Sequence, residues 1–155
     1  MAINPNTDFS SGQTLTADNM NRLPRGVMAY AESTTSDTSI TVEEQQYSLT
    51  FTAVASRYYK ISWFEPDTGI TGAGAGAILL RFRLTNITGT QLQGAYTWVP
   101  SSAVDTVSSL VYVGTFTAGS KTIICSAQAT GGVTHQLNRA TGKIGFVVIE
   151  DIGPA

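Results

Sequence analysis

The chain has 155 residues, of which 42% are hydrophobic and only 13% are charged, and its formal net charge is −2. This length fits a single domain with a real core, while the slightly acidic balance and the scattered Lys and Arg argue against a nucleic-acid partner. No apolar run approaches the ~20 residues of a membrane helix, and Cys125, the single cysteine, excludes an intramolecular disulfide framework.

Residues 1–25 predict an extended N-terminal arm. Its first part, MAINPNTDFSSGQT, offers only Ile3 and Phe9 as side chains worth burying, so it cannot form a core alone. The same segment lacks the basic and apolar regions of a signal peptide, and we expect synthesis in a cytoplasm. We expect the arm either to be disordered or to lie across another surface.

A short helix is predicted near the end of the arm, over about residues 16–23. Thr16 is suited to cap it, Leu15 is placed to pack against Met20, and Pro24 stops it. A helix this short is marginal in water without tertiary packing, so we expect it to dock on a partner. The side chains available for that contact are Phe9, Leu15, Met20, Arg22, Leu23 and Arg25.

From residue 26 to residue 155 the apolar pattern has a period of two, which predicts strands with one buried face. The alternation is clearest where Tyr47, Leu49 and Phe51 take turns with polar residues. About eight to ten short strands separated by Gly, Pro and Asp turns predict an all-β sandwich or barrel. The expected strands are 26–31, 38–42, 47–52, 59–63, 78–85, 91–98, 110–116, 123–127, 133–138 and 143–150.

Two segments of the predicted domain echo each other, LTFTAVASRYYKISW (49–63) and VGTFTAGSKTIICSA (113–127). Each reads Thr-Phe-Thr-Ala, then a turn, then a return strand. We interpret them as two hairpins, with 123–127 lying beside 110–116. Two similar hairpins suit a jelly roll, although chance similarity between Thr-rich hairpins is the alternative.

The last strand, KIGFVVIE (143–150), is apolar on both faces. Such strands lie in the middle of a sheet and are covered on each side. Ile144, Phe146 and Val148 are therefore expected in the core or in a trimer contact. The low content of charged residues also favours a surface that is covered by another chain, because a free surface needs charge to keep a small domain dispersed. The alternative is a robust β-protein with a Thr-covered free surface.

The sequence contains few of the residues that a catalytic or metal-binding site would need. A hydrolase would have to use His135, the only histidine, paired with Cys125 across the Gly-Gly turn between them. Nothing marks a nucleophile elbow or an oxyanion loop. A zinc site needs roughly three or four His, Cys or carboxylate ligands, and these are not supplied. We predict no enzyme activity, no catalytic or metal-binding residues and no cofactor.

Two weaker possibilities concern calcium and sugars. Glu65 and Asp67 flank a proline ahead of a predicted turn at residues 67–69 and could hold calcium weakly, but a solvated turn is the preferred interpretation. Trp63, Trp98 and the six tyrosines could stack on sugars, although packing in a core or an interface is their commoner use.

Three segments resemble a family of small bacteriophage virion proteins. They are DFSSGQTLTADNMNRLPRGVMAYA (8–31), LTFTAVASRYYKISWFEP (49–66) and VVIEDIGPA (147–155). In that family a Leu-Thr-Ala-x-x-Met-Asn arm precedes a domain similar to the tumour-necrosis-factor-like jelly roll. The resemblance runs through most of the chain, and its motifs are structural. It implies a jelly-roll β-sandwich over 26–155, an arm over 1–25 and a homotrimer.

Members of this family serve as head decoration (cement) proteins or as tail and fibre components. The resemblance therefore implies a virion location and, first, a trimeric cement protein that binds the major capsid protein through its arm. No heptad shaft or repeat precedes the domain, which favours decoration over a fibre tip. The alternatives are a tail-associated or fibre-tip protein that binds tail proteins or a host surface glycan, and a hydrolase using His135. We expect neither a nucleic-acid nor a membrane partner.

Overall fold

The computed structural model describes residues 11–155 except residues 13, 15 and 22. Phe9, Leu15 and Arg22, three of the predicted arm contacts, lie outside the described residues. The described part contains one short helix and ten strands. Their bounds are α1 Ala17–Asn21, β1 Gly26–Ser33, β2 Asp37–Ile40, β3 Glu44–Ala53, β4 Arg57–Thr71, β5 Gly76–Leu84, β6 Gln91–Val99, β7 Thr106–Thr115, β8 Gly119–Thr130, β9 Thr134–Leu137 and β10 Gly145–Pro154.

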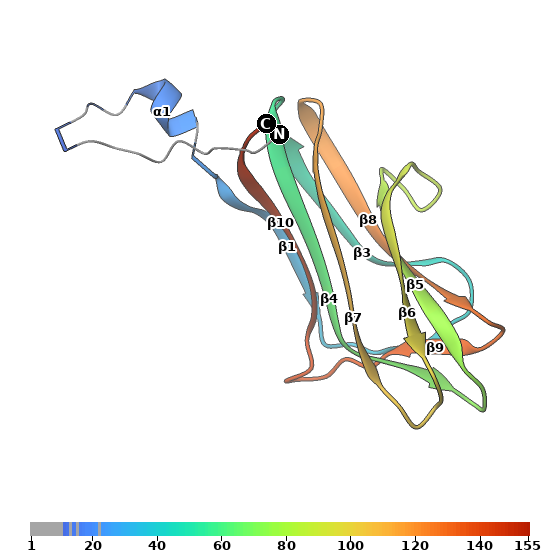
Figure 1. Ribbon diagram of the computed structural model, residues 1–155. Coiled ribbons are helices and arrows are strands. Elements are labelled where there is room, and N and C mark those ends of the chain that lie inside the picture. Colours follow the sequence, from blue (N-terminus) through green and yellow to red (C-terminus); the bar gives the residue numbers. More distant parts are fainter. Residues whose placement is uncertain (1–10, 13, 15, 22) are drawn as a thin grey trace.

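The strands form two antiparallel sheets packed as a sandwich (Figure 1). The first sheet has the order β1-β10-β4-β9-β2, with β7 also paired to β4, and the second has the order β3-β8-β5-β6. When the eight long strands are numbered alone, without β2 and β9, the sheets read 1-8-3-6 and 2-7-4-5. This is the double Greek-key order of a jelly roll, which confirms the predicted fold class.

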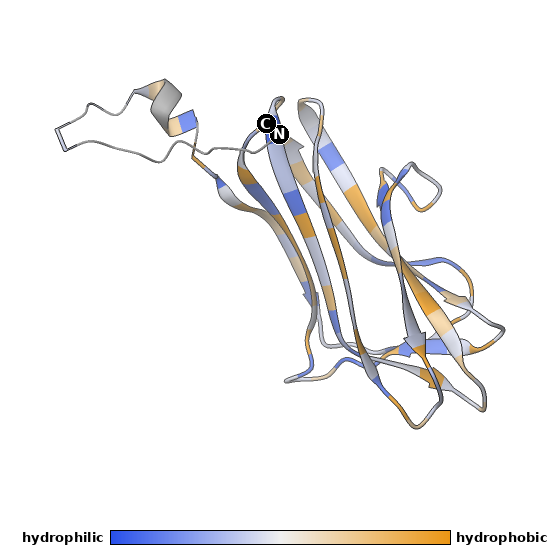
Figure 2. Ribbon diagram, in the orientation of Figure 1, coloured by the Kyte–Doolittle hydropathy of each residue, from blue (hydrophilic) through white to orange (hydrophobic). Residues whose placement is uncertain are grey.

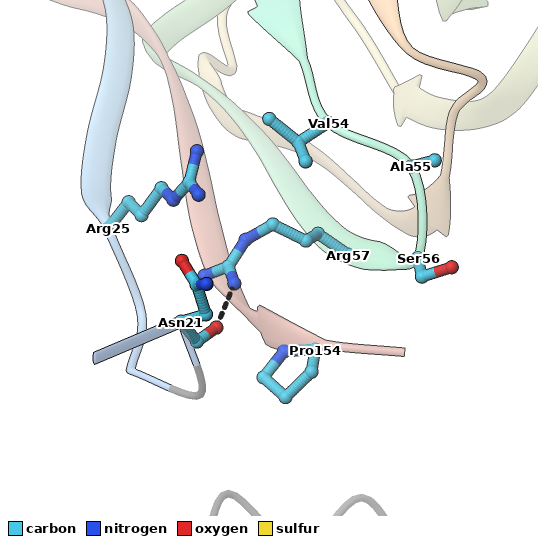
Figure 3. A pocket seen from close by; sticks show the side chains of 7 residues that line it. All are labelled: Asn21, Arg25, Val54, Ala55, Ser56, Arg57 and Pro154. Atoms are coloured by element: carbon cyan, nitrogen blue, oxygen red, sulfur yellow. Dashed lines mark hydrogen bonds between the residues drawn. The ribbon is translucent and has the colours of Figure 1, made fainter. Parts of the chain in front are cut away.

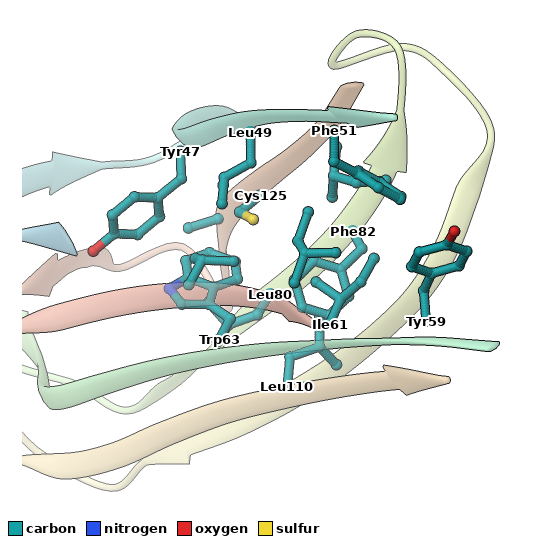
Figure 4. Close-up of a cluster of buried hydrophobic side chains, with 14 of the residues drawn as sticks. Tyr47, Leu49, Phe51, Tyr59, Ile61, Trp63, Leu80, Phe82, Leu110 and Cys125 are labelled. Atoms are coloured by element: carbon teal, nitrogen blue, oxygen red, sulfur yellow. The ribbon is translucent and has the colours of Figure 1, made fainter. Parts of the chain in front are cut away.

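The core lies between the two sheets because alternate residues of each strand point inward. Figure 4 shows its centre, where side chains of β3 and β5 meet those of β4. Tyr47 and Trp63 pack edge to face with ring centroids 5.9 Å apart. Complete burial of one large apolar side chain stabilises the fold by about 1.5–3 kcal/mol. The fully buried apolar and aromatic side chains include Trp63, Tyr59, Phe82, Ile40, Ile61, Ile78, Leu80, Ile123, Leu137 and Ile149.

The two Thr-Phe-Thr-Ala segments cross between the sheets instead of forming hairpins. Residues 54–56 join β3 of the second sheet to β4 of the first, and residues 116–118 join β7 of the first sheet to β8 of the second. The predicted pairing of 123–127 with 110–116 is therefore wrong, because alternation shows which residues point inward but not which sheet a strand joins. Phe51 and Phe116, the phenylalanines of the two segments, pack with centroids 5.6 Å apart at this end of the core.

Residues 67–69, where the sequence predicts a turn, are part of strand β4. This part of β4 pairs with β9, with Gly69 opposite Gln136. Glu65 is 0% exposed and Asp67 is 6% exposed, so the interpretation of this segment as a solvated turn is wrong. The physical reason is that distant basic side chains neutralise both carboxylates, as described below.

Strand β10 is central in the first sheet, as predicted, between β1 and β4. Within one chain it is covered on one face only. Val147 and Ile149 are buried in the core, whereas Phe146 and Val148 alternate with them on the half-buried outer face. In the hydropathy colouring, hydrophobic and hydrophilic residues are interspersed along the long strands (Figure 2).

Helix α1 occupies five residues inside the predicted range. The Met20 amide donates to the Thr16 carbonyl at 3.1 Å, which places Thr16 at the N-cap position, as predicted. The Leu23 amide donates to the Met20 carbonyl at 3.2 Å and closes the last turn before Pro24. Among the described residues, no helix has the length and apolar character needed to cross a membrane.

Candidate interaction surfaces

The outer side of the first sheet carries an apolar surface across four neighbouring strands. The strand register places Val148 of β10 opposite Tyr30 of β1. On its other side Val148 lies opposite Ser62 of β4, which in turn lies opposite Val111 of β7. We call this surface the outer apolar face and define it by Tyr30, Phe64, Val111, Val113, Phe146 and Val148.

Aromatic contacts order the centre of the outer apolar face. Phe146 packs against Phe64 with ring centroids 5.4 Å apart and against Tyr30 at 6.3 Å. Tyr30, Val111 and Val113 are nonetheless 55%, 49% and 50% exposed. A contiguous exposed apolar surface of this kind is a candidate interaction site.

The charged side chains beside this face have hydrogen-bond or ion-pair partners within the chain. Lys60 and Glu150 lie opposite each other on β4 and β10, with Nζ and Oε2 3.4 Å apart. The Tyr30 hydroxyl donates to Glu32 Oε2 at 2.6 Å. A partner packing on the outer apolar face would therefore meet few unpaired charges that need desolvation.

A buried arginine ties the base of the arm to the domain. Arg57, the first residue of β4, is 4% exposed and pairs with Asp151 of β10 through two hydrogen bonds of 2.5 and 2.7 Å. Its Nη1 donates to the carbonyl oxygen of Asn21 at 2.5 Å (Figure 3). Its Nη2 also donates to the carbonyl oxygen of Leu23 at 2.6 Å. Because helix ends leave carbonyls without intrahelical partners, Arg57 acts as a C-terminal cap for α1.

A pocket of about 290 Å³ opens beside this junction (Figure 3). Arg57 forms part of its wall, and Arg25, which is exposed, stands at the arm side. The pocket therefore depends on how the arm is seated against the domain. Its lining residues are Asn21, Arg25, Val54, Ala55, Ser56, Arg57 and Pro154.

A second buried ion pair occupies the other half of β4. Arg139 donates from Nε and Nη2 to the two carboxylate oxygens of Glu65 at 2.8 and 2.7 Å. Trp63 Nε1 donates to Glu65 Oε1 at 2.7 Å, and the guanidinium of Arg139 lies 5.1 Å from the ring centroid of Tyr47. Burial and the nearby charge of Glu65 raise the pKa of the Tyr47 hydroxyl. Both carboxylate oxygens of Glu65 thus accept hydrogen bonds from side chains of the same domain.

Asp67 is engaged in the same way. Lys143 Nζ donates to its Oδ2 at 2.5 Å, and Asn138 Nδ2 donates to its Oδ1 at 3.0 Å. The pair with Glu65 that we considered for calcium is therefore a pair of structural acceptors. Across the part of the chain that the structure describes, no cluster of three or more His, Cys, Asp or Glu could hold a metal ion.

His135 and Cys125 lie in different sheets, on β9 and β8, and each is 0% exposed. Burial raises the pKa of the Cys125 thiol, which disfavours the thiolate that a nucleophile needs. Burial also lowers the pKa of His135, and the Gly69 backbone opposes this only in part. Neither imidazole nitrogen has a hydrogen-bond partner of ordinary geometry among the described residues. These two side chains are positioned as core residues.

The remaining predicted contact residues fall at two separate places. Met20 is 53% exposed on α1, Leu23 is half-buried, and Arg25 is exposed just before β1. Ile144 is 38% exposed and directly precedes β10, whose residues Phe146 and Val148 belong to the outer apolar face.

Sequence reasoning missed Arg57 and the members of the outer apolar face on β1 and β7. Residues 107–114 carry apolar side chains at both alternate sets of positions, a signal that could have indicated Val111 and Val113. No local pattern marks Arg57, because its role depends on Asp151, 94 positions away in the chain.

No family model matches the chain, and no curated protein matches it. Among solved structures, the globular domain of zebrafish complement 1qA protein is similar with a TM-score of 0.45 and 14% identity, over 83% of this chain and 97% of that one. Eiger TNF from S. frugiperda is similar with a TM-score of 0.40 and 12% identity, over 85% of this chain and 92% of that one. The CBM22-1 xylan-binding domain of Paenibacillus barcinonensis Xyn10C is similar with a TM-score of 0.41 and 12% identity, over 86% of this chain and 99% of that one. The jelly-roll assignment rests on the strand order, and these likenesses carry no functional argument.

Replacing Arg57 by Leu should lower the free energy of unfolding by about 3–5 kcal/mol, because Asp151 stays buried without its partner. The double variant Arg57→Leu/Asp151→Leu should recover much of this loss, since no charge is then buried. Urea unfolding measures both. Lys60→Leu removes an exposed ion pair and serves as the control, with an expected change of about 1 kcal/mol or less. An Arg57→Leu loss no larger than the control would contradict the role of Arg57.

The buried imidazole of His135 should make stability depend on pH. Its pKa is lowered in the folded chain, so below the ordinary value of about 6.5 the unfolded chain takes up a proton that the folded chain does not. The free energy of unfolding should therefore fall as pH decreases through this value. Urea unfolding between about pH 5 and pH 8 should show the slope in the wild type and a flatter profile in His135→Leu. Equal slopes in the two proteins would show that His135 does not titrate differently on folding.

Proposed function

We propose that this protein is a non-enzymatic virion component that forms homotrimers and decorates a phage head by binding the major capsid protein. The observation that carries the proposal is the outer apolar face, which spans β1, β10, β4 and β7 and has no covering element in the described chain. The resemblance of the arm and of the terminal segment to small phage virion proteins supports the location.

Copies of the same chain are the occupants that suit the outer apolar face. The backbone groups of β10 and β4 are already paired within the sheet, so contacts there are made by side chains. Val and aromatic side chains without unpaired charge favour a dry, permanent interface. Repetition of one contact around an axis produces a closed ring when the rotation closes, and the resemblance implies that three copies form it.

The arm supplies the attachment to the shell. Arg57 holds its base against the domain, and α1 stands away from the sandwich beyond that point (Figure 1). Met20, which is 53% exposed on α1, is the apolar side chain that a partner would cover. A trimer presents three such arms, and multivalency turns individually weak contacts into firm attachment.

Val111→Asp should convert the trimer to monomers while leaving the fold intact. Val111 is 49% exposed in the single chain, so the folded monomer tolerates the carboxylate, whereas an interface would bury it without a partner. Sedimentation equilibrium at micromolar concentration measures the mass, and circular dichroism checks the fold. Ser48→Asp, on the exposed face of the other sheet, is the matched control and should stay trimeric. A wild-type monomer, or a trimeric Val111→Asp, would refute the role of the outer apolar face.

Met20→Asp should abolish binding to heads stripped of this protein, whereas Arg25→Ala should weaken it little. A buried Met contributes about 1.5–3 kcal/mol, whereas an exposed ion pair contributes about 0–1 kcal/mol. Pull-down at moderate and high salt compares the two variants. Removal of residues 1–23 should leave a folded trimer that no longer binds heads. If Arg25→Ala prevents binding and Met20→Asp does not, docking is electrostatic. If the deletion removes the protein from tails while heads stay stable, the protein belongs to the tail.

A further inference from the structure

The second sheet carries a separate pair of exposed rings on its outer side. Tyr96 and Trp98 lie on the edge strand β6 and are 67% and 62% exposed. Residues two apart in a strand project from the same face, about 6.6–6.8 Å apart along it. Their neighbours on β5 are Leu79 and Ala77, which are apolar and only 6% and 8% exposed. The two exposed rings therefore stand beside buried apolar side chains of β5.

A polar row next to these side chains is held in place by its own contacts. Gln128 lies opposite Leu79 and accepts a hydrogen bond from Arg81 Nη1 at 2.7 Å. Arg81 also pairs with Glu43 at 2.9 Å, and the same carboxylate accepts from Arg83 at 2.6 Å. The charged side chains of this row are only 14–19% exposed. These contacts fix the side chains of the row, in which the guanidinium groups of Arg81 and Arg83 share the Glu43 carboxylate.

Several donors beside the rings are unused within the chain. The Tyr96 hydroxyl, the Trp98 Nε1–H and the Gln128 amide N–H groups make no hydrogen bond to another described residue. The surface thus alternates apolar rings with free donors. The outer apolar face of the first sheet differs, because it presents Val and aromatic groups and suits a protein surface.

We infer that this ring platform, defined by Leu79, Tyr96, Trp98 and Gln128, binds an uncharged chain of equatorially linked β-pyranose sugars. Such sugars present flat C–H faces that pack on aromatic rings and a rim of hydroxyls that accept and donate hydrogen bonds. The two rings are largely exposed on an edge strand, so the platform suits an internal stretch of a chain. The guanidinium groups and the carboxylate of the row are engaged with one another, so ring contacts and the free donors are what the platform offers to a ligand.

The ring platform and the outer apolar face lie on opposite sides of the sandwich, because one belongs to each sheet. A trimer formed through the first sheet leaves the second sheet accessible. Sugar binding therefore does not rest on the proposed decoration function. A monomeric or tail-located protein would carry the same platform.

The test uses the full chain with two neutral probes, the β-1,4-linked hexaoses of glucose and of N-acetylglucosamine. Trp63 is 1% exposed and Trp98 is 62% exposed, so fluorescence quenching by acrylamide reports mainly on Trp98. At least one hexaose should protect Trp98 in a saturable way, with no dependence on salt. Tyr96→Ala and Trp98→Ala should each weaken binding by about tenfold or more in calorimetry, as truncation of an aromatic anchor does.

Val42→Ala, which truncates an exposed apolar side chain (66% exposed) that belongs to neither surface, is the control and should bind the hexaose like the wild type. Absence of saturable protection by both probes at millimolar concentration would overturn the inference. So would unchanged binding by Trp98→Ala. If Trp98→Ala instead disrupts the trimer or the attachment to heads, the platform is a protein contact and the sugar assignment is wrong.

Discussion

Two buried charges on β4 are the constraint around which the rest of the fold is arranged. Arg57 begins the strand and is neutralised by Asp151 of β10, while Glu65 is neutralised by Arg139 from the segment between β9 and β10. A buried charge without its partner is strongly destabilising. Pairing of β4 with β10 in another register would separate Arg57 from Asp151 and move the apolar side chains to the wrong face. The ion pairs therefore select one register for the central strands of the first sheet.

The same register creates the surface that we propose for assembly. With Asp151 turned inward beside Arg57, Val147 and Ile149 also point into the core, and Phe146 and Val148 must point outward. Arg57 also fixes the base of the arm, because its remaining donors bind the carbonyl of Asn21, the last residue of α1, and the carbonyl of Leu23 just beyond it. One guanidinium thus connects the buried centre of the sheet to the base of the arm, and the position of the arm is coupled to the integrity of β4 and β10.

The two outer faces of the sandwich differ in chemistry. The first sheet presents Val and aromatic side chains beside a Lys60–Glu150 ion pair and a Glu32 carboxylate that accepts from Tyr30, which suits a largely apolar partner surface. The second sheet presents two separated rings with unused donors and a fixed polar row, which suits a hydroxyl-rich ligand. A jelly roll leaves both faces available because only its inner faces form the core. Assembly and ligand binding can therefore reside on one small domain without competing for the same surface.

The sequence by itself determined the strands, the helix cap and part of the candidate interface. Alternation of buried and exposed residues is a local property, so the pattern around Tyr47 and Phe51 predicted β3, and KIGFVVIE predicted a central strand with Phe146 and Val148 at contact positions. Only the tertiary structure decided which strands share a sheet, which is why Tyr30 and Val111 joined the interface and the two Thr-Phe-Thr-Ala segments became crossovers. It also decided the role of Glu65, whose partner Arg139 lies 74 positions away. Alternation specifies which side chains are buried, whereas the partner that neutralises a buried charge is set by pairing between distant strands.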